Sequence, residues 1–367
     1  MKVSIVTLHR LFNYGSVLQA YATQKIFENE GCTAEIVDYV TPQRTAKRLL
    51  CINKKGISKK EQIKNLLILP LRFGSFLLKR QKFGKFLKKY CNVTKHKYIT
   101  AEDIIANPPI ADIYITGSDQ VWNSKYNEGV DKGFFLEYML PNKKAIAFVS
   151  SFGKRQLDEN ELELTKEYLK KYSHLSVRED SAAKILSELG YSSEWLIDPT
   201  LQIDKSEWHE IASKRLIKEK YLILMLLYNE DNGATEYARK IADKKGLKLV
   251  KISWELIRHR LVDKLMTHRS PQDFLSLFYY ADFVVTNSFH GTAFSINFNR
   301  DFIVVPRKEF NSRIESLLRL TNLTERRVFS EEEALSVSAE KINYDNVNSI
   351  LEQERERAEK FVKKSIG

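Results

Sequence analysis

VSIVTLHRLFNYGSVLQAYATQKIFENEGCTAEIVDYV, residues 3–40, decides the fold of this chain. The run VSIVT (3–7) predicts a buried strand, and the residues after it follow helical spacing, with Ser16 as the expected N-cap and Gly31 as the glycine that closes the helix. AEIVDYV (34–40) predicts the next strand. A strand, a helix and a second strand in this order predict the start of a parallel α/β sheet.

This alternation occurs in two rounds along the chain. The first round runs to SEWLIDPTL (193–201), and the second starts at YLILMLLY (221–228). Because 367 residues exceed one ordinary core, we expect two domains, at 1–205 and 206–335, followed by a helical tail at 336–367. Two such domains place ligands in the cleft between them, at the carboxyl ends of the parallel strands.

The composition predicts a folded protein of a reducing compartment. Apolar residues make up 43% of the chain, and its three cysteines show no CxxC spacing. Its seven histidines show no HxxxH or HExxH spacing, so we expect no metal site. The start reads as a strand and no segment reaches about 18 uncharged apolar residues, so a cytoplasmic protein without a membrane-spanning helix is expected.

The net charge of +12 comes from one segment, residues 44–97. It holds 17 Lys and Arg and one acid, Glu61, and the rest of the chain has a balance of −4. We expect it to form a basic helical insertion, within which 61–90 shows helical spacing and places Phe73, Phe76, Phe83 and Phe86 among lysines. Peripheral contact with an anionic membrane is one interpretation, and a solvated insertion is the other. No nucleic-acid binding is expected, since no compact binding motif is visible.

Polar motifs follow two of the early strands. In FNYGSVLQA (12–20), Gly15 permits close approach and the helix start offers free N–H groups to an anion or a sugar hydroxyl, although an ordinary turn would look the same. In ITGSDQVWN (115–123), Asp119 is suited to orienting a hydroxyl or to capping a helix, and Trp122 is typical of a core residue.

A third motif, SVRED (176–180), puts Arg178 at the end of a buried strand. Its guanidinium matches phosphate or carboxylate bidentately, and an internal salt bridge is the alternative. The fourth motif, TNSFHGTAFSI (286–296), surrounds His290 with small and hydroxylated residues, and Lys308 and Arg313 follow it. Histidine transfers protons near neutral pH, but a packed structural histidine is equally compatible with these neighbours.

Taken together, these motifs resemble the polysaccharide pyruvyl transferase family. Six blocks match in order: NYGSVLQAYATQ (13–24), YITGSDQVWN (114–123), KKAIAFVSSFG (143–153), LSVREDSAAKIL (175–186), LIDPTL (196–201) and TNSFHGTAFSI (286–296). The resemblance implies a GT-B-like fold, with two Rossmann-like domains whose parallel sheets face a central cleft. It also implies phosphoenolpyruvate as donor and a pyruvate ketal on a sugar as product.

The resemblance assigns roles to individual residues. It makes His290 the catalytic acid or base and Arg178 a donor-binding cation, with Lys308 and Arg313 beside it. Ser288 stands where some family members have an arginine that contacts the donor. Either another cation takes that place, with Arg307, Lys308 and Arg313 nearest in sequence, or this branch handles its donor differently. Acceptor or cleft contacts are expected from a further set of residues: Asn13, Gly15, Ser16, Ser118, Asp119 and Asn287.

Three functions remain open at this point. The leading one is pyruvyl transfer to a saccharide, commonly lipid-linked at the inner face of the membrane, with phosphoenolpyruvate as co-substrate and no metal or other cofactor. The second is a sugar-nucleotide glycosyltransferase of the same architecture. The third is a non-enzymatic module that binds a membrane surface or nucleic acid through the basic segment.

Overall fold

The structure, a computed structural model, describes residues 1–42, 69–227, 230–254, 258–308 and 312–367. It contains two sheets in which every pairing is parallel. The first has the order β3-β2-β1-β4-β5-β6-β7 and the second β10-β9-β8-β11-β12. The strands are β1 (Lys2–Val6), β2 (Thr33–Tyr39), β3 (Val93–Tyr98), β4 (Ile113–Thr116), β5 (Lys144–Ser150), β6 (Tyr172–Val177), β7 (Glu194–Trp195), β8 (Tyr221–Met225), β9 (Lys248–Ser253), β10 (Lys264–Thr267), β11 (Phe283–Thr286) and β12 (Phe302–Val304).

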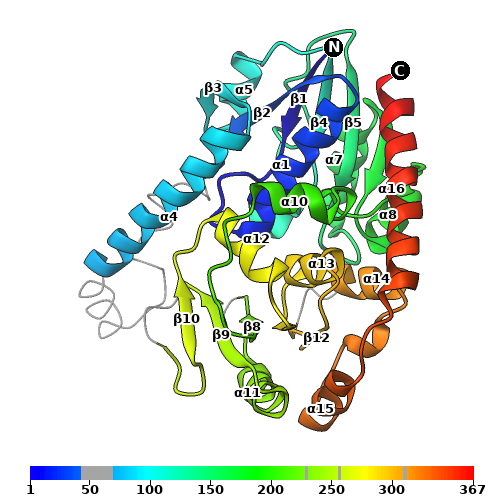
Figure 1. Cartoon of the computed structure of the whole chain (residues 1–367). Helices are drawn as coiled ribbons and strands as arrows, with labels where there is room; N and C mark the ends of the chain where they lie inside the picture. The colour runs from blue at the N-terminus through cyan, green and yellow to red at the C-terminus, as the bar shows by residue number, and fades with distance from the viewer. Residues whose placement is uncertain (43–68, 228–229, 255–257, 309–311) are drawn as a thin grey trace.

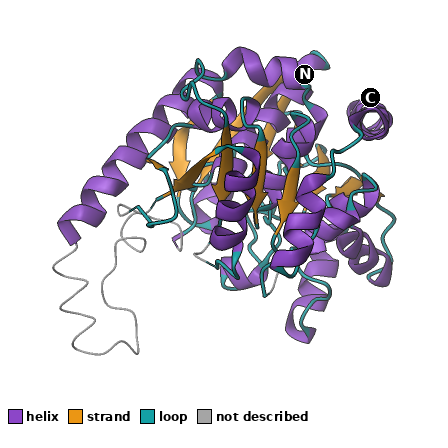
Figure 2. Cartoon of the chain, turned by 60° about the horizontal axis from the view of Figure 1, so that its bottom comes forward, coloured by secondary structure: helices purple, strands orange, loops and turns teal. Residues whose placement is uncertain are grey.

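Helices surround both sheets, so the predicted α/β class is confirmed (Figure 2). They are α1 (Tyr14–Asn29), α4 (Leu69–Tyr90), α5 (Ala101–Ala106), α6 (Ser124–Asn127), α7 (Glu159–Leu169), α8 (Asp180–Glu188), α9 (Pro199–Gln202), α10 (Lys205–Ile211), α11 (Ala234–Lys245), α12 (Pro271–Tyr279), α13 (Phe289–Asn297), α14 (Ser312–Leu320), α15 (Glu331–Ala339) and α16 (Tyr344–Ile366). Within the described ranges, no helix is both long and apolar enough to cross a membrane.

The cap of α1 differs from the prediction. Asn13, and not Ser16, caps the helix, because its side chain accepts from the backbone N–H groups of Gly15 (2.9 Å) and Ser16 (3.4 Å). The helix therefore begins three residues earlier than expected, and the Ser16 hydroxyl is released for another contact. Gly31 follows the helix with φ +77°, as a closing glycine should.

The basic segment is more integrated than a helical insertion. Residues 43–68 lie outside the described part, but α4 packs its second half into the core and β3 joins the first sheet as its edge strand, parallel to β2. Of the four phenylalanines expected among lysines, Phe83 and Phe86 are buried, and Phe76 packs edge-on against Phe12 at 5.3 Å between ring centroids. The prediction of a helical insertion over 44–97 is therefore wrong for β3, and the solvated interpretation is wrong for the buried side chains of this half of α4. Contact of its exposed cations with a membrane stays a prediction.

The two domains share one apolar cluster. It combines Val17 and Leu18 of α1 and Phe86 of α4 with Phe274 of α12 and Phe294 of α13. The chain also returns to the first domain at its end, where α16 packs Phe361 against Phe148 of β5 at 6.3 Å between ring centroids (Figure 1). These contacts fix how the carboxyl ends of the two sheets meet.

Candidate functional site

Polar residues from both domains meet where the carboxyl ends of the strands come together. Ser16 follows β1, Asp119 follows β4, Arg178 follows β6, Asp198 follows β7 and His290 follows β11. In the first sheet β1 lies between β2 and β4, so the connections leave β1 in opposite directions there. A parallel α/β sheet binds ligands at such a switch point.

Arg178 is the centre of this group, and its side chain has no exposed surface. Its Nη1 donates to Oδ2 of Asp198 at 2.7 Å, and its Nη2 lies 3.3 Å from Oδ1 of Asp119. Its guanidinium also lies over the ring of Phe289, 4.9 Å from the centroid. The internal salt bridge of the sequence analysis therefore exists, made by carboxylates distant in sequence. Glu179, the adjacent acid, lies 4.0 Å from Nε.

Asp119 has a strained backbone, with φ +74°. One carboxylate oxygen accepts from the Ser16 hydroxyl at 2.6 Å, and the other from the backbone N–H of Gln120 at 2.8 Å. Burial alone would raise its pKa, but Arg178, His290 and Arg313 together hold the pKa below the usual value. The carboxylate is therefore ionised and accepts from the hydroxyl of Ser16, while the role predicted for it toward an acceptor stays a prediction. Trp122 is a core residue, stacked on Phe135.

His290 lies in the first turn of α13, directly against the start of α1. A Cβ atom built on Gly15 would lie only 1.9 Å from its Nδ1, so residue 15 must be glycine for the imidazole to occupy this position. Nε2 lies 3.9 Å from Oδ2 of Asp198 and has no hydrogen-bond partner although it is buried. Two further buried atoms lack a hydrogen-bond partner, Nε of Arg178 and Oε2 of Glu179, which lie 4.0 Å from each other. Unpaired buried polar atoms mark a place where a ligand is expected.

Burial sets the protonation of His290. Desolvation lowers its pKa from 6.5 to about 4, despite the opposing effect of Asp198 and Asp119. At neutral pH the imidazole is therefore uncharged. A neutral imidazole has one ring nitrogen able to accept a proton, which suits a general base.

Arg313 adds a second cation from the other domain. Its guanidinium lies over the same Phe289 ring at 5.6 Å. With the Gln120 amide oriented so that its oxygen faces Arg313, that oxygen accepts from Nη2 at 2.6 Å and from Nη1 at 3.2 Å. Desolvation and the nearby Arg178 lower the pKa of Arg313, but an arginine stays protonated at any working pH.

A surface groove begins next to Arg313. It lies between α8 and α14 and is lined by Arg155, Asp180, Ser181, Lys184, Ser312, Glu315, Ser316 and Arg319. Across it, Ser316 donates to Asp180 at 2.6 Å and Arg155 pairs with Glu315 at 3.2 Å. The two domains therefore touch at the groove as well as through Phe289.

Three further predicted residues make internal hydrogen bonds, and their binding roles stay predictions. Ser288 caps α13 by accepting from the N–H of Gly291 at 3.3 Å. Asn287 bonds through its amide to the backbone of Leu227 (2.7 Å to the N–H) and Glu230 (2.9 Å to the carbonyl). Ser118 reaches the group through a 3.3 Å bond from its hydroxyl to Asp198.

Lys308 is not among the contacts of this group in the described structure. Its side chain is exposed, and its backbone N–H donates to Glu230 at 3.4 Å. Arg307, the other nearby cation, pairs with the same carboxylate at 2.8 Å.

The sequence analysis assigned no role to Asp198. Besides the contact with Arg178, this carboxylate accepts from the N–H (2.9 Å) and hydroxyl (2.7 Å) of Thr200, so Asp198 is the N-cap of α9. The signal was present in LIDPTL, where an acid precedes a proline at a strand end, but a helix cap alone accounts for that pattern. Only the fold shows that the same carboxylate also faces Arg178 and His290.

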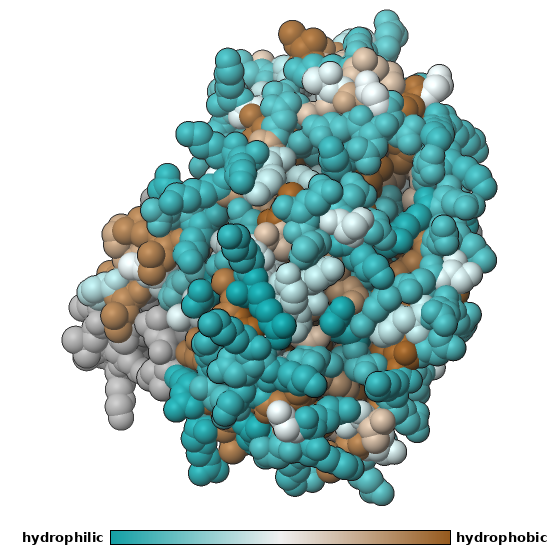
Figure 3. All heavy atoms as spheres, in the orientation of Figure 1, coloured by the Kyte–Doolittle hydropathy of each residue, from teal (hydrophilic) through white to brown (hydrophobic). Residues whose placement is uncertain are grey.

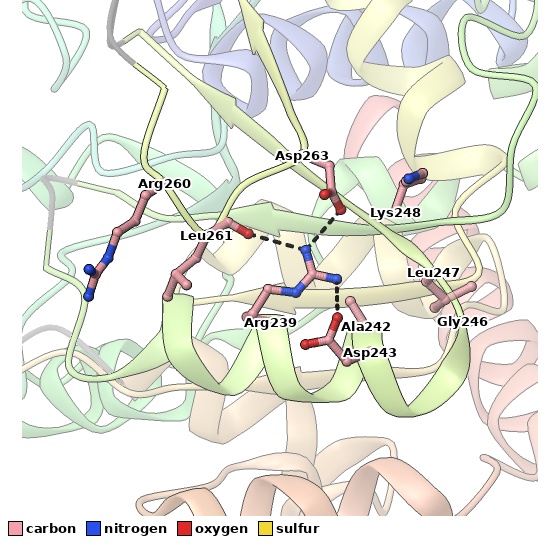
Figure 4. Close-up of a pocket in the computed structure, with 9 residues that line it drawn as sticks. All are labelled: Arg239, Ala242, Asp243, Gly246, Leu247, Lys248, Arg260, Leu261 and Asp263. Carbon is pink, nitrogen blue, oxygen red and sulfur yellow. Dashed lines mark hydrogen bonds and ion pairs between the residues drawn. The ribbon is translucent and has the colours of Figure 1, made fainter.

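A separate hollow in the second domain lies at the edge of its sheet opposite to the strand ends that carry His290 (Figure 4). Lys248 begins β9 and Asp263 directly precedes β10, so this hollow lies at the amino ends of the strands. Arg239 fills it, pairing with Asp263 at 2.8 Å and Asp243 at 2.7 Å. Two carboxylates thus neutralise the guanidinium of Arg239, and we assign the hollow no ligand. Nowhere in the described ranges do three or more His, Cys, Asp or Glu gather as a metal would need.

The model of the polysaccharide pyruvyl transferase family matches residues 13–309. The chain belongs to this family. The match includes the residues that we call the strand-end group: Ser16, Asp119, Arg178, Asp198 and His290. Arg313 lies just beyond the matched residues. No curated protein gives a significant match to this pyruvyl transferase family member.

Solved structures show the fold of this family member. UDP-GlcNAc 2-epimerase from Neisseria meningitidis bound to UDP-GlcNAc is similar, with a TM-score of 0.51 and 10% identity over 100% of this chain and 99% of that one. The Streptomyces sp. SF2575 glycosyltransferase SsfS6, complexed with thymidine diphosphate, has a TM-score of 0.50 and 12% identity over 99% and 98%. The predicted GT-B architecture of two Rossmann-like domains is confirmed.

Proposed function

We propose that the protein transfers the enolpyruvyl unit of phosphoenolpyruvate to two hydroxyls of one sugar, forming a pyruvate ketal on a cell-surface polysaccharide or its lipid-linked precursor. The observation that carries this proposal is the unpartnered, buried Nε2 of a neutral His290, held beside two arginines in a chain of the pyruvyl transferase family. It offers a proton acceptor and anion-binding groups in one place.

The chemistry balances with one donor and one diol. A proton is added to the methylene carbon of phosphoenolpyruvate, which leaves an oxocarbenium centre at the adjacent carbon. The first sugar hydroxyl attacks that carbon and loses its proton. The carbon–oxygen bond to phosphate then breaks, and the second hydroxyl closes the ketal. One hydroxyl proton replaces the proton placed on the methyl group, and the other leaves with phosphate.

His290 is suited to accept a hydroxyl proton, because its imidazole is uncharged before the donor binds. An anionic donor placed beside it would raise its pKa, so the ring would take up a proton from solvent as the donor binds and give it to the methylene carbon. The ring is then neutral again and can accept the proton of the attacking hydroxyl. Asp119 already accepts from one hydroxyl, that of Ser16, and a sugar hydroxyl has the same chemistry.

Arg313 supplies the cation that is absent at Ser288. Arg178 is already paired with Asp198 and Asp119, so it holds these two carboxylates in place and has little uncompensated charge for a donor anion. Arg313 contacts a neutral amide and an aromatic ring and acts on Asp119 and Glu179 without a close ion pair in the described part of the chain, so its guanidinium is suited to a phosphate or carboxylate. The further donor-binding role predicted for Lys308 stays a proposal, and from its exposed position Lys308 would act on a donor only at the rim.

The test is incubation with phosphoenolpyruvate and a panel of saccharide acceptors. Release of phosphate together with the mass gain of a pyruvate ketal on the acceptor supports the proposal. Consumption of a nucleotide sugar with no use of phosphoenolpyruvate would identify a glycosyltransferase instead. If His290→Ala kept full activity in either assay, the assignment of this histidine would be wrong.

A further inference from the structure

The first half of α4 extends from the body of the protein and carries exposed apolar side chains (Figures 1 and 2). Four of them form what we call the α4 apolar face: Leu71 (61% exposed), Phe73 (49%), Leu77 (44%) and Leu78 (46%). Figure 3 shows hydrophobic atoms gathered at the end of this helix. Single exposed leucines are common on proteins, but four within eight residues of one helix call for a partner.

The second half of the same helix shows that the face is not part of the core. Phe83, Phe86 and Leu87 are buried against α1 and α12, and they hold the helix to the body. Within the first half, Ser75 also bonds to His268 of the second domain, with 2.6 Å between its hydroxyl and Nε2, so the exposed side chains lie beside a contact with the body. The anchored half fixes the direction in which the α4 apolar face points.

The charge of α4 identifies the partner. Its 22 residues include seven Lys and Arg and no acid. Arg80, Lys85, Lys88 and Lys89 are exposed and follow the apolar face along the helix. Apolar side chains next to a row of cations match the acyl and headgroup layers of an anionic bilayer. A protein partner fits less well, because lysine is depleted at protein interfaces.

We propose that the α4 apolar face and the cations after it bind the surface of an anionic lipid bilayer. The helix is linked to the strand-end group through Phe83 and Tyr14, whose ring centroids lie 5.4 Å apart. Tyr14 directly precedes Gly15, which contacts His290. The bound helix therefore keeps the site beside the bilayer. Its use in catalysis rests on the proposed function, because a lipid-linked acceptor would be presented at that surface, but the binding itself does not.

Flotation of the full-length protein with vesicles tests the proposal. Phosphatidylcholine vesicles with phosphatidylglycerol are compared with vesicles of phosphatidylcholine alone, without donor or acceptor. The wild type should float with the anionic vesicles and be released by high salt. Leu77→Ala/Leu78→Ala and, separately, Arg80→Gln/Lys85→Gln should each weaken binding by about tenfold or more.

Matched controls remove equally exposed residues elsewhere. Ile110→Ala/Phe329→Ala deletes apolar groups that are 75% and 64% exposed, and Lys218→Gln/Lys220→Gln deletes two exposed cations, and both should bind like the wild type. No flotation of the wild type, or equal flotation of all variants, would overturn the proposal. It would also be overturned if the α4 changes dissociated a dimer without altering flotation. Unchanged ketal formation on a soluble acceptor shows that the proposed function stands whichever result is found.

Discussion

Gly15 of the first domain lies directly under the imidazole of His290 of the second, so closely that a Cβ atom would be 1.9 Å from Nδ1 and 2.1 Å from Cγ. The start of α1 thus forms one wall of the histidine's position. The two domains must keep this spacing for Nε2 to stay beside Asp198.

Gly15→Ala should therefore disable the site without weakening the helix. Alanine is favoured over glycine in a helix by about 1 kcal/mol, but its methyl group would push the ring out of place. We expect pyruvyl transfer to fall by about 10² or more, because small misplacements of a reacting group are this costly. Gly84→Ala in α4, where a Cβ meets no atom within 4 Å, is the matched control and should keep full activity. Wild-type activity of Gly15→Ala would contradict the geometry.

The neutral state of His290 predicts a pH dependence of stability. Its pKa is about 4 in the folded chain and 6.5 in the unfolded chain, so between these values the unfolded state binds more protons. The contribution of His290 is complete above pH 6.5 and is lost as pH falls through about 4. His290→Gln should therefore flatten the dependence by about 1–2 kcal/mol between pH 7 and pH 5, measured by urea unfolding. Parallel curves for variant and wild type would argue against a buried neutral histidine.

Asp198→Asn tests the charge balance around Arg178. The variant keeps an oxygen for Thr200 but leaves Arg178, whose side chain is fully buried, with Asp119 as its remaining close carboxylate at 3.3 Å. Breaking a buried pair in this way should lower the free energy of unfolding by about 3–5 kcal/mol. Asp112→Asn, at a surface pair with Lys143, should change it far less. Similar unfolding midpoints for the two variants would show that Arg178 does not depend on Asp198.

Arg313→Gln should raise the apparent KM for phosphoenolpyruvate more than it lowers kcat. Loss of a charged hydrogen bond to an anion is expected to cost about 10–100-fold in KM. Arg319→Gln removes an exposed cation from the same helix and should leave KM unchanged. An equal fall in kcat and kcat/KM would instead assign Arg313 to the transition state alone.

Much of the fold follows from local signals in the sequence. Alternating apolar runs and helical spacing predicted most strands, because a buried parallel strand has to be apolar throughout. At the start of α12, Ser270 caps the helix, Pro271 lies in its first turn and a capping box with Asp273 forms, a pattern that the local sequence indicates. Two nearby cap candidates, Asn13 and Ser16, could not be separated by pattern, and only the contact of Ser16 with Asp119 shows why the serine is left free.

The site was harder to predict because its members are joined by the fold alone. His290 and Arg178 lie more than a hundred residues apart, and their common neighbour Asp198 looked like an ordinary helix cap. β3 was missed because its sequence, VTKHKY, is polar, as an edge strand facing solvent can be. The phenylalanines of α4 were grouped by spacing, whereas neighbouring elements bury some of them and leave others exposed.

The return of α16 to the first domain has a consequence for synthesis. Phe361 and Val362 complete the apolar layer over Val3, Ile5 and Phe148. A ribosome releases those last residues only after the whole second domain has been made. Part of the first sheet therefore stays uncovered until α16 has been synthesised, so the folding of the first domain is completed only after the second domain has been made.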